Sequence, residues 1–165
     1  MIWDMKDAKD RKDLFTAVKG HIIIGMDFDD TILDKSKSFP LRFELFKALA
    51  NGRDSGTLVF ILTARSTRID EVERYCAQND INIDSIVYNM QDKASDIIDL
   101  DSESAGVVAH FDDDESVCET LVLHNIAAFY PYEFAVPKLV REWRETLYRS
   151  GELKHYIDAE HPRIK

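Results

Sequence analysis

Residues 22–33 read I-I-I-G-M-D-F-D-D-T-I-L, an apolar run that breaks into acids and then turns apolar again. Three consecutive β-branched residues without a helical period are typical of a buried strand, which places Asp27 and Asp29 at its carboxyl end. Strand alternation puts these two carboxylates on one side and Phe28 on the other. Carboxylates held this close need a cation, a shared proton or water to compensate them. Alone, the stretch also fits a solvated turn after a strand.

Apolar runs and helical stripes alternate along the rest of the chain. Predicted strands are the run before Asp27 and residues 57–62, 81–88, 106–111 and 126–130; predicted helices are 40–50, 66–78, one opening at Lys93, one carrying Val117, and 137–150. This alternation predicts a three-layer, Rossmann-like α/β fold with a parallel sheet of about five strands. All strand carboxyl ends then meet at one edge, where ligands bind in such sheets.

The chain length fits one domain. Its 165 residues, 45% of them hydrophobic, are enough for a single core over residues 1–165. Residues 1–20 are expected to form a peripheral N-terminal helix that stops at Gly20, and residues 152–165 a loosely ordered tail. Cys76 and Cys118 have apolar neighbours at helical spacing, so we expect buried core thiols.

The charge balance is acidic. Thirty-one acids against 21 bases give a formal charge of −10, which opposes non-specific binding to nucleic acid or membranes and suits metal capture. The charged N-terminal segment lacks a signal-peptide pattern, and no apolar run approaches the roughly 20 residues of a membrane span. We therefore expect a cytoplasmic protein without a membrane partner.

Groups that complement the acids of the first strand follow other strands. They are Thr63, Ala64 and Arg65 after the second strand, Lys93 at a helix start, and Asp112 and Asp113 after the fourth. A lysine in a first helical turn is unfavourable beside the helix dipole, so nearby carboxylates would explain it. Each residue also has an ordinary interpretation: a backbone-bonded strand-end hydroxyl, a solvated arginine or lysine, or acids that cap a helix.

Together these groups match the needs of phosphoryl transfer. That reaction requires a nucleophile, a proton donor for the leaving oxygen, donors to the phosphoryl oxygens and a cation that neutralises charge. Mg²⁺ is usually bound by one or two carboxylates, a carbonyl and waters, which fits the number of acids.

This ordered set resembles the haloacid dehalogenase (HAD) superfamily of phosphotransferases. D-F-D-D-T at 27–31 matches the first motif, V-F-I-L-T at 59–63 the second, Lys93 the third, and V-A-H-F-D-D at 108–113 the fourth. The resemblance spans residues 21–130.

The fourth motif departs from the common form. That form opens with Gly-Asp, whereas here His110 and Phe111 precede Asp112. A direct metal contact by Asp113 is therefore left open. A histidine within a strand is more often a packing residue than a metal ligand.

The resemblance implies a role for each matching residue. Asp27 would attack phosphorus to give an aspartyl-phosphate, and Asp29 would protonate the leaving group and then activate water. Lys93 would hold Asp27 and the phosphate together. Substrate contacts would come from Thr63, Ala64, Arg65 and Lys93; Mg²⁺ ligands would be Asp27, the backbone carbonyl of Asp29, Asp112 and, directly or through water, Asp113.

The spacing leaves no room for a cap domain between these motifs. Capless members resemble enzymes that act on large substrates or borrow a cover from a neighbouring subunit, so a homo-oligomer stays open. T-A-R at 63–65 and the paired acids are similar to the phosphatase domain of phage-type polynucleotide kinases, which implies nucleic-acid 3′-phosphate ends as substrate. The acidic charge opposes a nucleic-acid substrate, so a nucleotide or another small phosphomonoester is the alternative.

Two other classes remain as alternatives. A phospho-acceptor signalling domain also uses an acid cluster, Thr and Lys on a parallel sheet, but in a different chain order. An inactive binding module would keep the fold without turnover, and the intact Asp27 and Asp29 argue against it.

Overall fold

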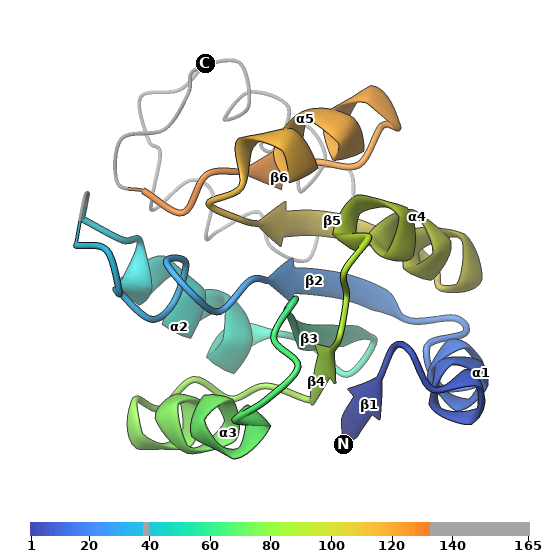
Figure 1. Cartoon of the computed structure of the whole chain (residues 1–165), viewed down its shortest axis with the longest axis horizontal. Helices are drawn as coiled ribbons and strands as arrows, with labels where there is room; N and C mark the ends of the chain where they lie inside the picture. Colours follow the sequence, from blue (N-terminus) through green and yellow to red (C-terminus); the bar gives the residue numbers. More distant parts are fainter. Residues whose placement is uncertain (38–39, 133–165) are drawn as a thin grey trace.

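A six-stranded, fully parallel sheet forms the centre of the molecule, in the order β1-β4-β3-β2-β5-β6 (Figure 1). The computed structural model describes residues 1–37 and 40–132. The strands are β1 (Ile2–Asp4), β2 (Ile22–Met26), β3 (Thr57–Leu62), β4 (Ser85–Tyr88), β5 (Gly106–Phe111) and β6 (Ala128–Phe129). The helices are α1 (Ala8–Ala17), α2 (Phe43–Gly52), α3 (Ile69–Gln78), α4 (Lys93–Glu103) and α5 (Glu115–Leu123). The predicted three-layer α/β class is confirmed, and no cap domain is present among these residues.

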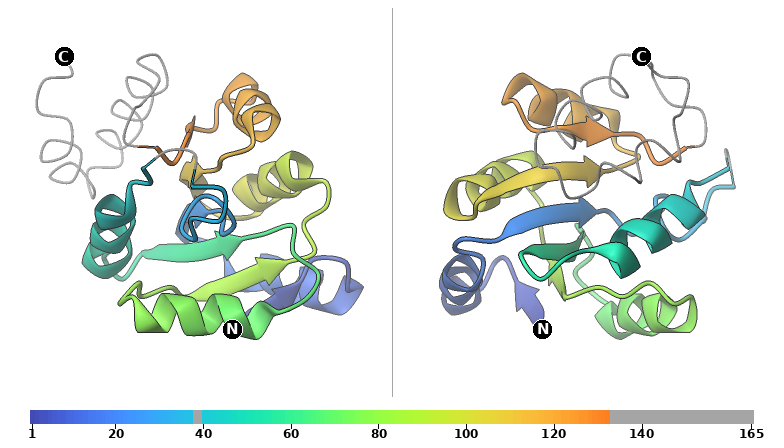
Figure 2. Two further views of the ribbon diagram at one scale, coloured as in Figure 1. Left: turned by 60° about the vertical axis from the view of Figure 1, so that its left-hand side comes forward. Right: turned by 180° about the vertical axis from the view of Figure 1, so that it is seen from behind.

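Helices cover both faces of the sheet (Figures 1 and 2). The chain crosses from β2 to β3 to β4 in one direction and then returns over β2 to β5 and β6 on the other side. Because crossovers between parallel strands are right-handed, reversing the direction moves the connecting helix to the opposite face. Accordingly, α2 and α3 pack on one face, and α1, α4 and α5 pack on the other.

Strand alternation divides the central strands between two apolar clusters. Met26 and Phe111 lie in the cluster beneath α2 and α3, whereas Phe60 and Leu62 lie in the cluster beneath α1, α4 and α5. Successive side chains of a strand point to opposite faces, so Asp27 and Asp112, which directly follow Met26 and Phe111, face the second helical layer. The side chains that follow β2 and β5 are thereby directed toward α4.

The N-terminal segment differs from its prediction as a single peripheral helix. Residues Ile2–Asp4 form β1, a strand in addition to the five predicted, which pairs with β4 at the sheet edge. The helix covers only Ala8–Ala17. Trp3 and Met5 are buried. The sequence did not indicate this strand because three residues are too few to give a periodic pattern.

Several element boundaries also shift. The strand predicted at 81–88 begins at Ser85, and the helix predicted from residue 40 begins at Phe43. The helix predicted from Ser66 begins at Ile69, and its N-cap, Arg68, has a left-handed φ of 57° and no side-chain cap hydrogen bond. The predicted helix 137–150 and tail 152–165 lie outside the described residues.

The two cysteines are confirmed as core residues. Cys76 lies on the buried side of α3 and Cys118 on the buried side of α5, and both are free thiols. No helix within residues 1–37 and 40–132 has the length and apolar character needed to cross a membrane.

Candidate functional site

The predicted site residues meet above the carboxyl ends of β2, β3 and β5, at the point where the chain reverses its direction across the sheet. A cavity of about 660 Å³ opens there. Its lining contains every residue predicted for the site: Asp27, Asp29, Thr63, Ala64, Arg65, Lys93, Asp112 and Asp113. This is the position at which open α/β sheets bind ligands.

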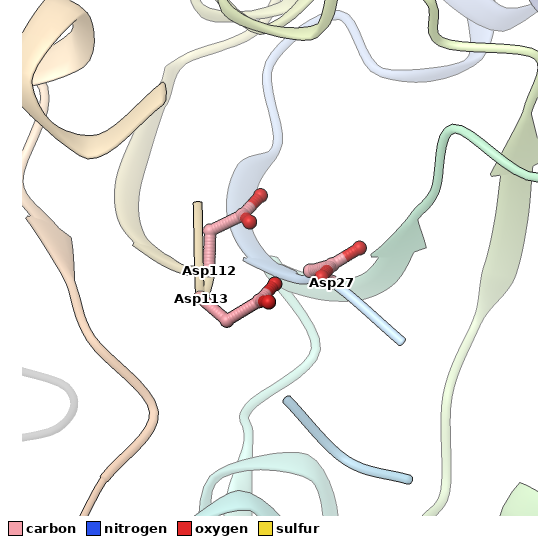
Figure 3. Close-up of side chains that lie close together, drawn as sticks. All are labelled: Asp27, Asp112 and Asp113. Atoms are coloured by element: carbon pink, nitrogen blue, oxygen red, sulfur yellow. The ribbon is translucent and has the colours of Figure 1, made fainter. Parts of the chain in front are cut away.

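Three carboxylates converge within this cavity. Figure 3 shows Asp27 after β2 together with Asp112 and Asp113 after β5. One oxygen of each carboxylate lies within 4.8 Å of the other two. Asp27 and Asp112 are buried, with 7% and 1% of their surfaces exposed, and Asp113 is half-buried. We call Asp27, Asp112 and Asp113 the carboxylate trio.

Lys93 supplies a positive charge to the trio. Its Nζ lies 2.6 Å from Asp27 Oδ1 and 2.9 Å from Asp112 Oδ2, and only 9% of its side chain is exposed. Burial disfavours the ammonium, but the attraction of both carboxylates outweighs this effect and raises the pKa of Lys93. The unfavourable place of this lysine at the start of α4 is thus explained by its ion pairs.

One ammonium does not balance three carboxylates. Burial raises the pKa of Asp27 despite the opposing charge of Lys93, and burial with a hydrogen bond to Asp27 raises the pKa of Asp113 to about 7. Burial also opposes ionisation of Asp112, but the hydrogen bond from His110 and the charge of Lys93 prevail and lower its pKa. The trio therefore retains excess negative charge that either a proton or a cation can neutralise. Its hard oxygen donors could hold a metal ion.

Two residues that sequence reasoning did not assign to the site fix these carboxylates. Thr31 donates its hydroxyl hydrogen to Asp27 Oδ2 at 3.2 Å, and His110 Nε2 lies 2.9 Å from Asp112 Oδ2. Both residues are fully buried. For His110 a signal existed, because residues two apart on a strand share a face. Thr31 follows a turn whose course the sequence pattern does not give.

Asp29 lies in the same cavity but is engaged elsewhere. Arg65 binds its carboxylate through two contacts, Nε to Oδ2 at 2.7 Å and Nη2 to Oδ1 at 2.8 Å. The same guanidinium contacts Glu71 at 3.2 Å and stacks over the Phe28 ring at 5.0 Å. Hydrogen bonds from Arg65 lower the pKa of Asp29. Arg65 is thus a paired residue of the loop before α3, not a solvated arginine of its first turn.

Thr63 and Ala64 follow β3 along the wall of the cavity. Thr63 is buried, and its Oγ1 accepts a hydrogen bond from the backbone N–H of Arg65 at 3.1 Å. This bond to backbone is the ordinary role expected for a strand-end hydroxyl. Ala64 is exposed and also lines the cavity.

Comparisons of the chain with protein-family models, with curated proteins and with solved structures found no match.

Proposed function

We propose that the protein is a Mg²⁺-dependent phosphomonoester hydrolase of the capless HAD type, which acts through an aspartyl-phosphate on Asp27. One observation carries the proposal: Lys93 joins Asp27 to Asp112, and Asp113 completes the trio at the switch point of the sheet. A buried carboxylate that is paired with a cation and lies beside carboxylates able to hold a metal ion suits phosphoryl transfer to Asp.

The carboxylate trio and the backbone carbonyl of Asp29 would hold the magnesium ion. Mg²⁺ prefers oxygen ligands and keeps several waters, so an open cavity with three carboxylates suits it. When bound, the ion neutralises negative charge on the phosphoryl oxygens. The chain's own cation, Lys93, adds electrostatic stabilisation of the phosphoryl charge.

The first step forms a bond between an Asp27 carboxylate oxygen and phosphorus and breaks the ester P–O bond. Asp29 gives its proton to the leaving alkoxide. In the second step Asp29 takes a proton from water, the water oxygen attacks phosphorus, and the P–O bond to Asp27 breaks to release inorganic phosphate. Thr31 orients Asp27 throughout by its hydrogen bond to Oδ2.

The ion pair between Asp29 and Arg65 must open for this chemistry. An Asp29 carboxylate held by two guanidinium contacts has a lowered pKa and is a poor proton donor. Arg65 lines the same cavity, so an incoming phosphomonoester dianion competes with Asp29 for the guanidinium. If the Arg65 guanidinium leaves Asp29 and contacts the substrate phosphate, Asp29 is free to take up a proton.

The deciding experiment measures phosphate release from an aryl phosphate with Mg²⁺. Asp27→Asn removes the nucleophile and should abolish turnover. Asp70→Asn is the matched control, because Asp70 forms an exposed surface pair with Arg74 and should leave turnover unchanged. Mg²⁺-dependent turnover that persists in Asp27→Asn would refute the nucleophile assignment. A wild-type protein that becomes phosphorylated but does not release phosphate would indicate a phospho-acceptor domain instead.

The charge around the cavity favours a small phosphomonoester, such as a nucleotide, over a nucleic-acid end. Beyond the trio, the lining adds Asp29, Asp30, Asp92 and Asp114, while its cations, Arg65 and Lys93, are both paired with acids. A polyanion would meet repulsion from these acids. Turnover of a 3′-phosphorylated oligonucleotide, a nucleoside monophosphate and a sugar phosphate should be compared; a clear preference for the oligonucleotide would support the 3′-end alternative.

A further inference from the structure

We infer that His110 is a positioning residue that holds the Asp112 carboxylate in the orientation needed to bind a cation. The inference rests on the metal site of the proposed function. His110 does not touch the cavity: it is fully buried in β5, two residues before Asp112, and is absent from the cavity lining. Its action must therefore pass through Asp112.

The hydrogen bonds of Asp112 leave one direction for a cation. A carboxylate offers about four lone-pair positions on its two oxygens. Oδ2 contacts both His110 Nε2 and Lys93 Nζ at 2.9 Å, and Oδ1 accepts the backbone N–H of Asp114 at 3.0 Å. One lone pair of Oδ1 is then left over. Without His110, the carboxylate would be held on Oδ2 by Lys93 alone, whose long side chain also binds Asp27.

The tautomer of His110 follows from its neighbours. The Asp112 carboxylate can only accept, so Nε2 must carry the hydrogen. Nδ1 is buried and has no hydrogen-bond partner. A bare nitrogen lone pair in an apolar setting costs less than a buried N–H without an acceptor, which also favours hydrogen on Nε2. Hydrogen bonds of this kind to metal-binding groups fix their orientation.

Gly25 provides the space that this arrangement needs. It is the cross-strand neighbour of His110 in the pairing of β2 with β5. A Cβ atom at position 25 would lie 2.6 Å from His110 Nδ1 and 2.7 Å from Leu62 Cδ1. Any other residue would therefore push the imidazole ring or Leu62 aside. The ring can take its place against Asp112 only because β2 carries no side chain there.

The test measures Mn²⁺ binding through the loss of the free-ion signal in electron paramagnetic resonance. His110→Leu removes the donor at similar volume and should weaken Mn²⁺ affinity about 10- to 100-fold. His110→Gln keeps an N–H donor at a similar reach and should recover most of that affinity. Val107→Ala, a buried change in the same strand, should lower thermal stability and leave Mn²⁺ affinity at the wild-type value.

Each outcome decides the inference. Equal affinity of His110→Leu and wild type would overturn it and leave the proposed metal site intact. Equally weak binding by the Leu and Gln variants, with the Val107 control unaffected, would also overturn it. A wild-type protein that does not bind Mn²⁺ would overturn both the inference and the metal-dependent function. Independently of any variant, ¹⁵N chemical shifts should show hydrogen on Nε2 of His110, and hydrogen on Nδ1 would contradict the geometry.

Discussion

Replacing Lys93 by methionine tests the electrostatics of the site most directly. The change keeps the length of the side chain and removes the ammonium that lies 2.6 Å from Asp27 and 2.9 Å from Asp112. At an effective dielectric constant of about 20, each attraction is about 6 kcal/mol before desolvation is subtracted. Desolvation offsets much of this, and removal of one partner from a buried ion pair costs about 3–5 kcal/mol.

The expected result is a large loss of thermal stability without metal at about pH 8. A loss of about 3–5 kcal/mol corresponds to a fall in Tm of about 9–15 °C for a domain of this size. The deficit should shrink at about pH 5, because Asp113, whose pKa is raised to about 7, gains a proton there and no longer repels the other two carboxylates. Mg²⁺ should stabilise the variant more than the wild type, because the ion replaces the missing charge.

Lys35→Met is the matched control. Lys35 lies 3.9 Å from Asp29, and its side chain is 60% exposed, so water screens the pair. The control should unfold within about 3 °C of the wild type, since a surface pair contributes at most about 1 kcal/mol. If Lys93→Met unfolds at the wild-type temperature at pH 8 without metal, the ammonium does not compensate the trio and the reasoning fails.

Three further predictions concern other ionisable groups. Mn²⁺ affinity, measured by calorimetry, should rise from about pH 6 to about pH 8, because the pKa of Asp113 is raised to about 7 and a carboxylate must lose its proton to bind the ion; a flat profile would contradict this. In Arg65→Ala, ¹³C titration should show a higher pKa for Asp29 than in the wild type, whereas an unchanged value would exclude Arg65 as the cause of the shift. Burial raises the pKa of both the Cys76 and Cys118 thiols, so Ellman's reagent should modify neither before unfolding, and rapid reaction of the native protein would contradict the buried core.

The sequence by itself determined the layers of the fold and the residues at the strand ends. Largely apolar runs before Asp27, Thr63 and Asp112 are long enough to identify buried strands, and the helical stripes between them imply parallel connections. Lys93 could be identified as unusual because the helix dipole makes a first-turn lysine unfavourable without a nearby acid. These are local signals, carried by residues a few positions apart.

Only the tertiary structure decided which strands are neighbours and which side chains meet. Asp27 and Asp112 share Lys93 because β5 pairs with β2, and periodicity along one strand does not say which strand lies beside it. Likewise, no local pattern shows that Arg65 binds Asp29. The position of the His110 ring beside Gly25, where a side chain would displace it, depends on strand register. Local periodicity records which residues are buried, whereas strand order and register arise from packing the whole chain.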